Sequence, residues 1–222
     1  IIKFMNYSNA RKIMVDTQIR PNNIKDDNLI SLFSSIEKEL FLEPSHKEFA
    51  YFDSEINFGN NKSYLSNLHI AQLIQSAKIS KKDHILHIGA LTGYVTNFLS
   101  KLSNKVTAIE NDQILFEILN KNIKNFSMNN VTIHKSELND GFIKNSPYDL
   151  IFIDHIIDFI PDSIKKQINK SQGRLVSIER INDNLSKGFQ LTINNENYYK
   201  EFLFDSFSES KSIFLKKNNF VF

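Results

Sequence analysis

Cysteine is absent from the sequence, which excludes disulfide bonds, thiolate metal sites and a cysteine nucleophile. No apolar run approaches the roughly 18 residues that a membrane-spanning helix requires. The formal net charge is +2, so the chain has no broad field to attract nucleic acid or a membrane surface. The N-terminal segment is too polar after its first residues for a secretory signal. We therefore expect a cytoplasmic protein that binds neither nucleic acid nor membrane.

Apolar spacing predicts helices in the first third of the chain. Residues 8–20 show helical spacing behind a Ser-Asn cap and stop at Pro21, and a second helix follows and ends before Pro44. Residues 45–65 lose this periodicity and gather Gly, Asn and Ser, so we interpret them as an extended loop. Helical spacing returns from Asn67.

Five short β-rich runs follow: "HILHIG", "KVTAIE", "NVTIHK", "YDLIFID" and "GRLVSI". Helical segments are expected between successive runs, and this alternation indicates a parallel, doubly wound α/β sheet. After residue 187, "GFQLTI", "YYKEFLFDSF" and "KSIFLKKNNFVF" look like strands without helices between them. We expect them to form an antiparallel ending on the same sheet.

A glycine turn directly after the first parallel run suggests a cofactor loop. Gly89 and Gly93 stand where the backbone must turn sharply and approach a ligand, although such a turn alone is equally consistent with a structural role. Glu110 ends the next run, 21 positions after Gly89, where a carboxylate reaches the hydroxyls of a ribose. The alternative is that Glu110 is a solvated acid at a helix start.

The same segment narrows the choice of cofactor. The branched Leu91 obstructs the close backbone approach that a dinucleotide pyrophosphate needs, which favours an adenosine cofactor without phosphates, such as S-adenosylmethionine. Glu137 follows the third run, where an acid can accept a hydrogen bond from an adenine amino group. A surface loop acid is at least as good an interpretation of Glu137.

The chain resembles the protein-L-isoaspartate (D-aspartate) O-methyltransferases, in a divergent bacterial branch. The segments "ARKIMVDTQIRPNNIKD" and "FLEP" are similar to the family's N-terminal helix and Phe-Val-Pro segment. "SYLSNLHIAQLIQ" stands at the family's substrate loop, and "HIGALTGYVTNFLSKLSNKVTAIE" resembles its cofactor loop and ribose-binding strand. "SPYDLIFID" and "IPDSIKKQINKSQGRLV" resemble two later family segments, so the similarity extends over most of residues 8–178.

The resemblance implies a Rossmann-like S-adenosylmethionine-dependent methyltransferase fold, with a mostly parallel sheet, antiparallel C-terminal strands and an N-terminal helical cap. It implies one methyltransferase domain over residues 1–222. Within it we expect N-terminal helices and a substrate loop at 5–80, a cofactor-binding core at 81–180 and antiparallel strands at 181–222.

The implied activity is methyl transfer from S-adenosyl-L-methionine to the carboxylate of an isoaspartyl residue in a damaged protein or peptide. By resemblance, Ser66 corresponds to the loop serine that contacts the substrate carboxylate, but it could equally be the N-cap of the following helix. The candidate catalytic residue is thus Ser66, with no metal ligand. The candidate cofactor-binding residues are His87, Gly89, Ala90, Gly93, Tyr94, Glu110, Asn111, Glu137, Leu138 and Asp154.

Several residues leave alternatives open. His87 stands where the family has an acid and Leu91 where it has a glycine, so a second hypothesis is a member with weak or no catalysis and a regulatory or binding role. A third is a methyltransferase for another substrate. We expect Asp154 to end a strand and line the cleft, and His155 to be a solvated or hydrogen-bonded loop histidine rather than a metal ligand. The phenylalanines of the C-terminal half either pack internally or form a homodimer face.

Overall fold

The computed structural model describes residues 6–194 and 197–215 of the 222-residue chain. A small hairpin consists of β1 (Ile56–Gly59) and β2 (Lys62–Tyr64). The helices are α1 (Tyr7–Met14), α2 (Asp27–Ser35), α3 (Asn67–Ala77), α4 (Tyr94–Leu102), α5 (Gln113–Asn125) and α6 (Asp162–Lys165). The main sheet contains β3 (His84–Ile88), β4 (Lys105–Glu110), β5 (Val131–Lys135), β6 (Leu150–Ile157), β7 (Arg174–Asn182), β8 (Leu185–Asn194) and β9 (Asn197–Ser206). Within the described residues, no helix is long and apolar enough to cross a membrane.

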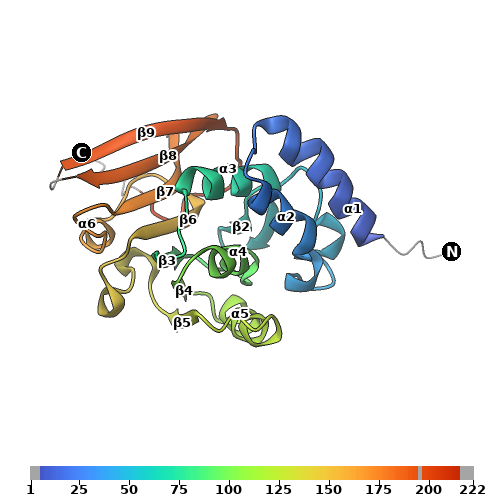
Figure 1. Cartoon of the computed structure of the whole chain (residues 1–222), viewed down its shortest axis with the longest axis horizontal. Coiled ribbons are helices and arrows are strands. Elements are labelled where there is room, and N and C mark those ends of the chain that lie inside the picture. The colour runs from blue at the N-terminus through green and yellow to red at the C-terminus, as the bar shows by residue number, and fades with distance from the viewer. Residues whose placement is uncertain (1–5, 195–196, 216–222) are drawn as a thin grey trace, which may run out of the picture.

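The main sheet has the strand order β5-β4-β3-β6-β7-β8-β9 (Figure 1). Strands β3 to β7 run parallel, and β8 and β9 add antiparallel strands at one edge, so the predicted sheet is confirmed. The chain moves outward from β3 to β5 and then returns to the other side of β3 with β6. The carboxyl ends of β3 and β6 therefore border the switch point where such sheets bind ligands. Of the third strand-like run, residues 211–215 form no strand and residues 216–222 lie outside the described residues.

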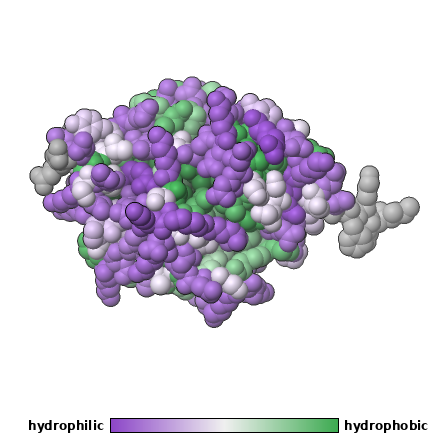
Figure 2. Space-filling view, viewed as in Figure 1, coloured by the Kyte–Doolittle hydropathy of each residue, from purple (hydrophilic) through white to green (hydrophobic). Residues whose placement is uncertain are grey.

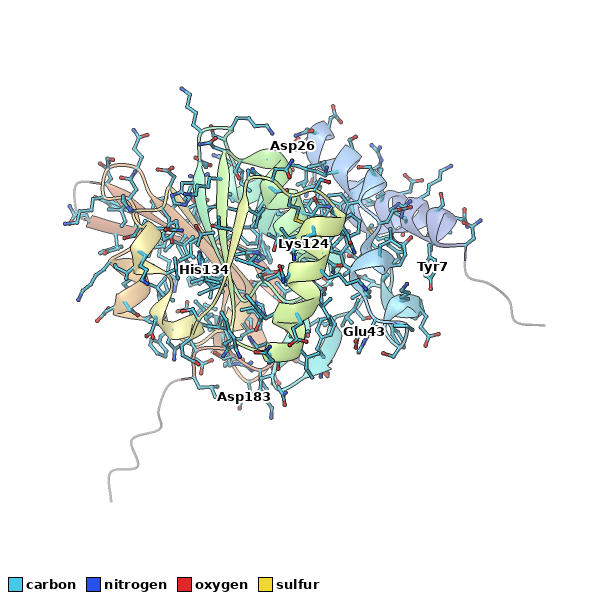
Figure 3. All side chains as sticks on the ribbon, turned by 90° about the horizontal axis from the view of Figure 1, so that it is seen from below. Tyr7, Asp26, Glu43, Lys124, His134 and Asp183 are labelled. Atoms are coloured by element: carbon cyan, nitrogen blue, oxygen red, sulfur yellow. The ribbon has the colours of Figure 1, made fainter. Side chains whose placement is uncertain are left out.

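The central strands β3, β4 and β6 are buried on both faces of the sheet, so that successive residues, which point to opposite sides, enter different parts of the core. Ile85 belongs to an apolar cluster that includes the N-terminal helices, α3 and α4, whereas Leu86 belongs to a second cluster on the other face. Helix α5, which carries Lys124, packs along β5, which carries His134 (Figure 3). In the space-filling view, hydrophilic residues cover most of the visible face and hydrophobic ones show between them (Figure 2).

The N-terminal helical cap lies at the end of the molecule away from β8 and β9 (Figure 1). The N-cap of α1 is Asn6, whose side chain accepts from the Asn9 N–H, so the predicted Ser-Asn cap is wrong. The helix continues as a π-helical turn at Val15–Ile19 and ends in a 3-10 turn at Arg20–Asn22. Pro21 lies in this last turn, where it has no N–H to continue the helical hydrogen bonds. The second helix ends at Ser35, earlier than predicted, because Ile36 has extended backbone angles.

Residues 45–65 are not simply an extended loop, as we had predicted. They contain a 3-10 turn at Lys47–Phe49 and the hairpin of β1 and β2. Asn60 and Asn61, between the two strands, both have positive φ, which is the geometry of a two-residue hairpin turn. The strands have four and three residues, too few to produce a recognisable alternation in the sequence.

The prediction of a helix between every pair of parallel strands is wrong for the connection from β5 to β6. This connection contains two 3-10 turns, at Leu138–Asp140 and Ile143–Asn145. Gly141, with a φ of 61°, and Pro147 both oppose a continuous helix there. Between β6 and β7, α6 has only four residues.

Candidate functional site

The loop between β3 and α4 lies at the switch point of the sheet. Gly89, Leu91 and Gly93 all have positive φ, of 76°, 50° and 93°. The Gly89 and Ala90 N–H groups both donate to Ile109 O of β4 at 3.0 Å, which fixes the start of the loop against the next strand. Leu91 thus adopts a left-handed conformation that usually favours glycine, at a position where the resembled family has glycine.

The ring of His155 lies directly over Gly89. A Cβ atom at position 89 would approach His155 Cε1 to 2.7 Å, so a larger residue would displace that ring. His155 is buried within β6. Its Nδ1 lies 3.6 Å from Asp154 Oδ1, beyond hydrogen-bond distance, and neither ring nitrogen has a hydrogen-bond partner among the described residues. The expectation of a solvated or hydrogen-bonded loop histidine is therefore wrong. Strand β6 continues to Ile157, and its pairing with β7 is irregular between Phe152 and Ile156. The predicted run "YDLIFID" ended at Asp154 and therefore did not include His155.

His87 and Asp154 form a buried pair across neighbouring strands. His87 Nε2 lies 2.9 Å from Asp154 Oδ1, and His87 Nδ1 lies 3.0 Å from Thr96 Oγ1 of α4. Burial alone would raise the pKa of the Asp154 carboxyl, but the neighbouring His87 and His155 hold this pKa well below its usual range. We had expected Asp154 to end its strand, and this prediction is wrong, because β6 continues past Asp154 to Ile157.

Glu110 ends β4 and is completely buried, so the interpretation as a solvated acid is wrong. Its Oε2 accepts from the Leu91 N–H at 2.9 Å, which joins it to the loop after β3. Its Oε1 accepts from the N–H groups of Asn111 and Asp112 at 2.9 and 3.0 Å. The Lys62 ammonium of β2 also donates to Oε1, at 2.8 Å. Glu110 therefore has both backbone and charged donors.

Glu137 and Leu138 lie next to this acid, at the start of the connection after β5. They line a hollow of about 260 Å³ together with Asn111 and Lys62. Glu137 is exposed and Leu138 is buried. The structure thus brings three of the predicted cofactor residues, Asn111, Glu137 and Leu138, to one hollow, and Lys62 of the same hollow contacts Glu110.

Ser66 caps α3, because its Oγ accepts from the His69 N–H at 3.3 Å. It also lines a separate groove of about 810 Å³. Glu55, which also lines this groove, accepts from the hydroxyls of Ser208 and Ser210. The capping role of Ser66 is confirmed, and its contact with an acceptor carboxylate stays a prediction.

Two buried lysines escaped the sequence analysis. Lys38 Nζ donates to Asn67 Oδ1 at 2.8 Å and lies over the rings of Tyr64 and Tyr94. Burial lowers the pKa of Lys38 to about 7, although Asp154 opposes this shift. Lys62 is the second, paired with Glu110. The Asn60–Asn61 turn was the one sequence signal that could have placed Lys62 on a hairpin.

The described residues at this edge of the sheet include no cluster of metal-ligand side chains. Across residues 6–194 and 197–215, no group of three or more His, Asp or Glu side chains is arranged to hold a metal ion. Asp183, labelled in Figure 3, follows the last residue of β7. Because β3, β4 and β7 run parallel, their carboxyl ends lie at the same edge of the sheet.

The strand order, the turn after β3 and the acid at the end of β4 define a Rossmann-like fold of the S-adenosylmethionine-dependent methyltransferase class. A family model described as Protein-L-isoaspartate(D-aspartate) O-methyltransferase (PCMT) matches residues 9–200. The chain belongs to this family.

Similar proteins carry the same family name. A protein-L-isoaspartate O-methyltransferase of Protochlamydia amoebophila is 29% identical over 73% of this chain and 77% of its own length. One of Roseiflexus sp. (strain RS-1) is 24% identical over 78% of each chain. A solved Plasmodium falciparum structure, described as a PCMT in complex with S-adenosyl-L-homocysteine, has a TM-score of 0.72 at 18% identity and covers 96% of this chain and 100% of its own. At this identity the structural similarity supports the fold.

Proposed function

We propose that the protein is an S-adenosylmethionine-dependent carboxyl O-methyltransferase that acts on isoaspartyl residues of damaged proteins. Family membership supports the activity. The observation that carries the proposal is the loop from Gly89 to Gly93. Its backbone has positive φ at Gly89, Leu91 and Gly93, and the Leu91 N–H donates a hydrogen bond to Glu110. The loop and the acid together are the parts that an adenosine cofactor requires.

The buried polar groups beside this loop fit such a cofactor. Asp154 Oδ2 and both ring nitrogens of His155 are buried and have no hydrogen-bond partner among the described residues. Unpaired buried polar atoms cost free energy, which a polar ligand group can recover. We assign Asp154 and His155 to the amino-acid end of the cofactor and Glu110 to its ribose. Asn111, Glu137 and Leu138 would lie at the adenine.

When bound, this cofactor supplies an electrophilic methyl group on a positively charged sulfur. The acceptor needs no strong base, because a carboxyl group with a pKa near about 4 is already ionised at neutral pH. The residues of the chain therefore act mainly by alignment, which contributes roughly 7–11 kcal/mol in well-oriented reactions. Ser66, at the N-terminus of α3, would bind the acceptor carboxylate, where free backbone N–H groups also favour an anion. The backbone amide nitrogen then attacks the methyl ester, which releases methanol and forms a succinimide, and water can open this ring to aspartate.

Calorimetric titration with S-adenosylmethionine and S-adenosylhomocysteine tests the cofactor assignment. We expect both to bind with dissociation constants below about 1 mM, since cellular catalysis normally needs at least such association. Absence of binding at about 1 mM would contradict the enzymatic proposal.

A second candidate function is a non-catalytic member of the family that retains the fold. The buried contact of Lys62 with Glu110 favours it, because the ammonium uses the carboxylate that a ribose would need. The same titration distinguishes the two candidates, since this second function predicts no binding.

A homodimer and a cytoplasmic location complete the proposal. The edge strand β9 exposes Tyr198, Tyr199 and Phe202, which suits a contact with a second copy. Light scattering should then give about twice the 25.8 kDa chain mass, and a monomer at all concentrations would exclude the dimer. The cytoplasmic location is supported by the absence of cysteine.

A further inference from the structure

Lys62 contributes a buried positive charge to the proposed ribose position. Its side chain is 8% exposed and that of Glu110 is not exposed at all. The ammonium donates to Glu110 Oε1 at 2.8 Å and to Asn111 Oδ1 at 2.7 Å. Both acceptors belong to residues that we assign to the cofactor, and Glu110 Oε1 is the oxygen that the ribose hydroxyls would also need.

Glu110 does not need Lys62 to be satisfied. The N–H groups of Leu91, Asn111 and Asp112 already donate to its two oxygens. A carboxylate with three backbone donors stays hydrogen-bonded when the ammonium leaves. The contact with Lys62 is therefore separable from the structural role of Glu110, and a ligand can replace it.

Contacts at both ends of β2 hold the hairpin against the region around the cofactor loop. The Tyr64 hydroxyl bonds to Thr92 Oγ1 and accepts from the Tyr94 N–H, at 2.9 and 3.0 Å. Ser63 bonds to Ser210 of the C-terminal segment. The tight turn at Asn60 and Asn61 then holds Lys62 at the tip of the hairpin, over Glu110. Lys62 is thus positioned by the hairpin and is not a mobile surface side chain.

The space beside Lys62 is smaller than a ligand site usually is. The hollow lined by Lys62, Asn111 and Glu137 measures about 260 Å³, whereas sites for small molecules typically span about 300–1,000 Å³. Because Lys62 forms part of its wall, displacement of this side chain would both enlarge the hollow and free Glu110.

We propose that Lys62 sets the cofactor affinity of this protein: its ammonium occupies the Glu110 carboxylate and must be displaced when the cofactor ribose binds. The inference rests on the proposed function, because it requires that the cofactor binds at Glu110. It assigns a role to a residue outside the loop and the strands that form the cofactor site. Lys62 lowers the affinity for the cofactor, whereas the residues that contact the cofactor raise it.

Calorimetric titration of S-adenosylhomocysteine into the full chain tests this inference. We would compare the wild type with Lys62→Met, whose unbranched side chain has a similar length but no charge. Lys62→Gln is a second variant that keeps a hydrogen-bond donor. Lys105→Met is the matched control, because Lys105 is an exposed residue at the opposite end of β4 from Glu110. Thermal unfolding of each variant verifies that it is folded.

We expect Lys62→Met to bind about 10- to 100-fold more tightly than the wild type, the range for one hydrogen bond to a charged group. Lys62→Gln should bind with an affinity between the two, because its amide can still donate to Glu110 but carries no charge. Lys105→Met should bind like the wild type. Equal affinities of the wild type and both Lys62 variants, or weaker binding by these variants, would overturn the inference and leave the proposed function intact. Absence of binding to every folded variant would instead overturn the proposed function, and the inference with it.

Discussion

His87 Nε2 lies 2.9 Å from Asp154 Oδ1, and both side chains are completely buried at the carboxyl edge of the sheet. The pair joins β3 to β6 at the switch point, and Thr96 extends it to α4. In the resembled family an acid stands at position 87. Here an acid on the neighbouring strand is held next to the histidine, so a carboxylate is still present at this edge.

The His87–Asp154 pair should be important for stability. His87→Leu removes one partner and leaves the Asp154 carboxylate buried, which costs about 3–5 kcal/mol. Urea unfolding at pH 7 measures this loss. The double variant His87→Leu, Asp154→Leu should regain most of it, because two apolar side chains replace the pair. A single variant as stable as the wild type would show that the pair is not needed.

Lys38 should make stability depend on pH. Burial lowers the pKa of Lys38 to about 7, below that of an unfolded lysine, so the unfolded chain binds more protons above pH 7. The free energy of unfolding should therefore rise between about pH 7 and pH 10, by at most about 1.4 kcal/mol per pH unit. Below pH 7 the contribution no longer changes, since the residue is protonated in both states.

The variant Lys38→Met should remove this slope and be more stable than the wild type at pH 7. Urea unfolding at intervals between pH 7 and pH 9 measures it, in a range where the protein stays folded. Lys12→Met, at an exposed position of α1, is the control and should keep the slope. A slope that persists in Lys38→Met would have to come from another group.

Ser66 has one established role and one proposed role, and two substitutions separate them. Ser66→Ala removes the cap of α3 and should cost about 1 kcal/mol in unfolding free energy. Ser66→Asn keeps a good capping residue and should recover that stability. If Ser66 also contacts the acceptor, kcat/KM for an isoaspartyl peptide should stay low in Ser66→Asn. Full recovery of kcat/KM would reduce Ser66 to a helix cap.

Glu110 should be required for cofactor binding. Glu110→Gln removes the charge that accepts the ribose hydroxyls and should weaken S-adenosylhomocysteine binding by about 1–3 kcal/mol. Glu117→Gln is the matched control, because Glu117 is exposed on α5 and bonds to Gln113 of the same helix. Isothermal calorimetry compares the two. An unchanged dissociation constant in a folded Glu110→Gln variant would contradict the ribose assignment.

The sheet was predictable because its signal is local. Buried parallel strands read as short apolar runs, and all five appear in the structure in the expected direction. The hairpin of β1 and β2 was missed because Tyr64 and Ser63 are held by contacts with Thr92 and Ser210, far along the chain. No local pattern encodes such contacts.

The same distinction applies to the site. Glu110 could be predicted because it follows the loop at a spacing that strand and helix lengths determine. Lys62 could not, because it is 48 positions from Glu110 and meets it only after the hairpin folds over β4. Lys38 likewise meets Asn67 across 29 positions. Burial of such lysines depends on the whole fold and not on neighbouring residues.

Transfer of a methyl group to an isoaspartyl peptide tests the central claim most directly. The purified chain would be incubated with S-adenosylmethionine carrying a labelled methyl group and with a peptide that contains isoaspartate, next to the same peptide with normal aspartate. The account predicts a base-labile methyl ester on the isoaspartyl peptide and none on its aspartyl control. No ester on either peptide, with a chain that is folded and binds the cofactor, would contradict it.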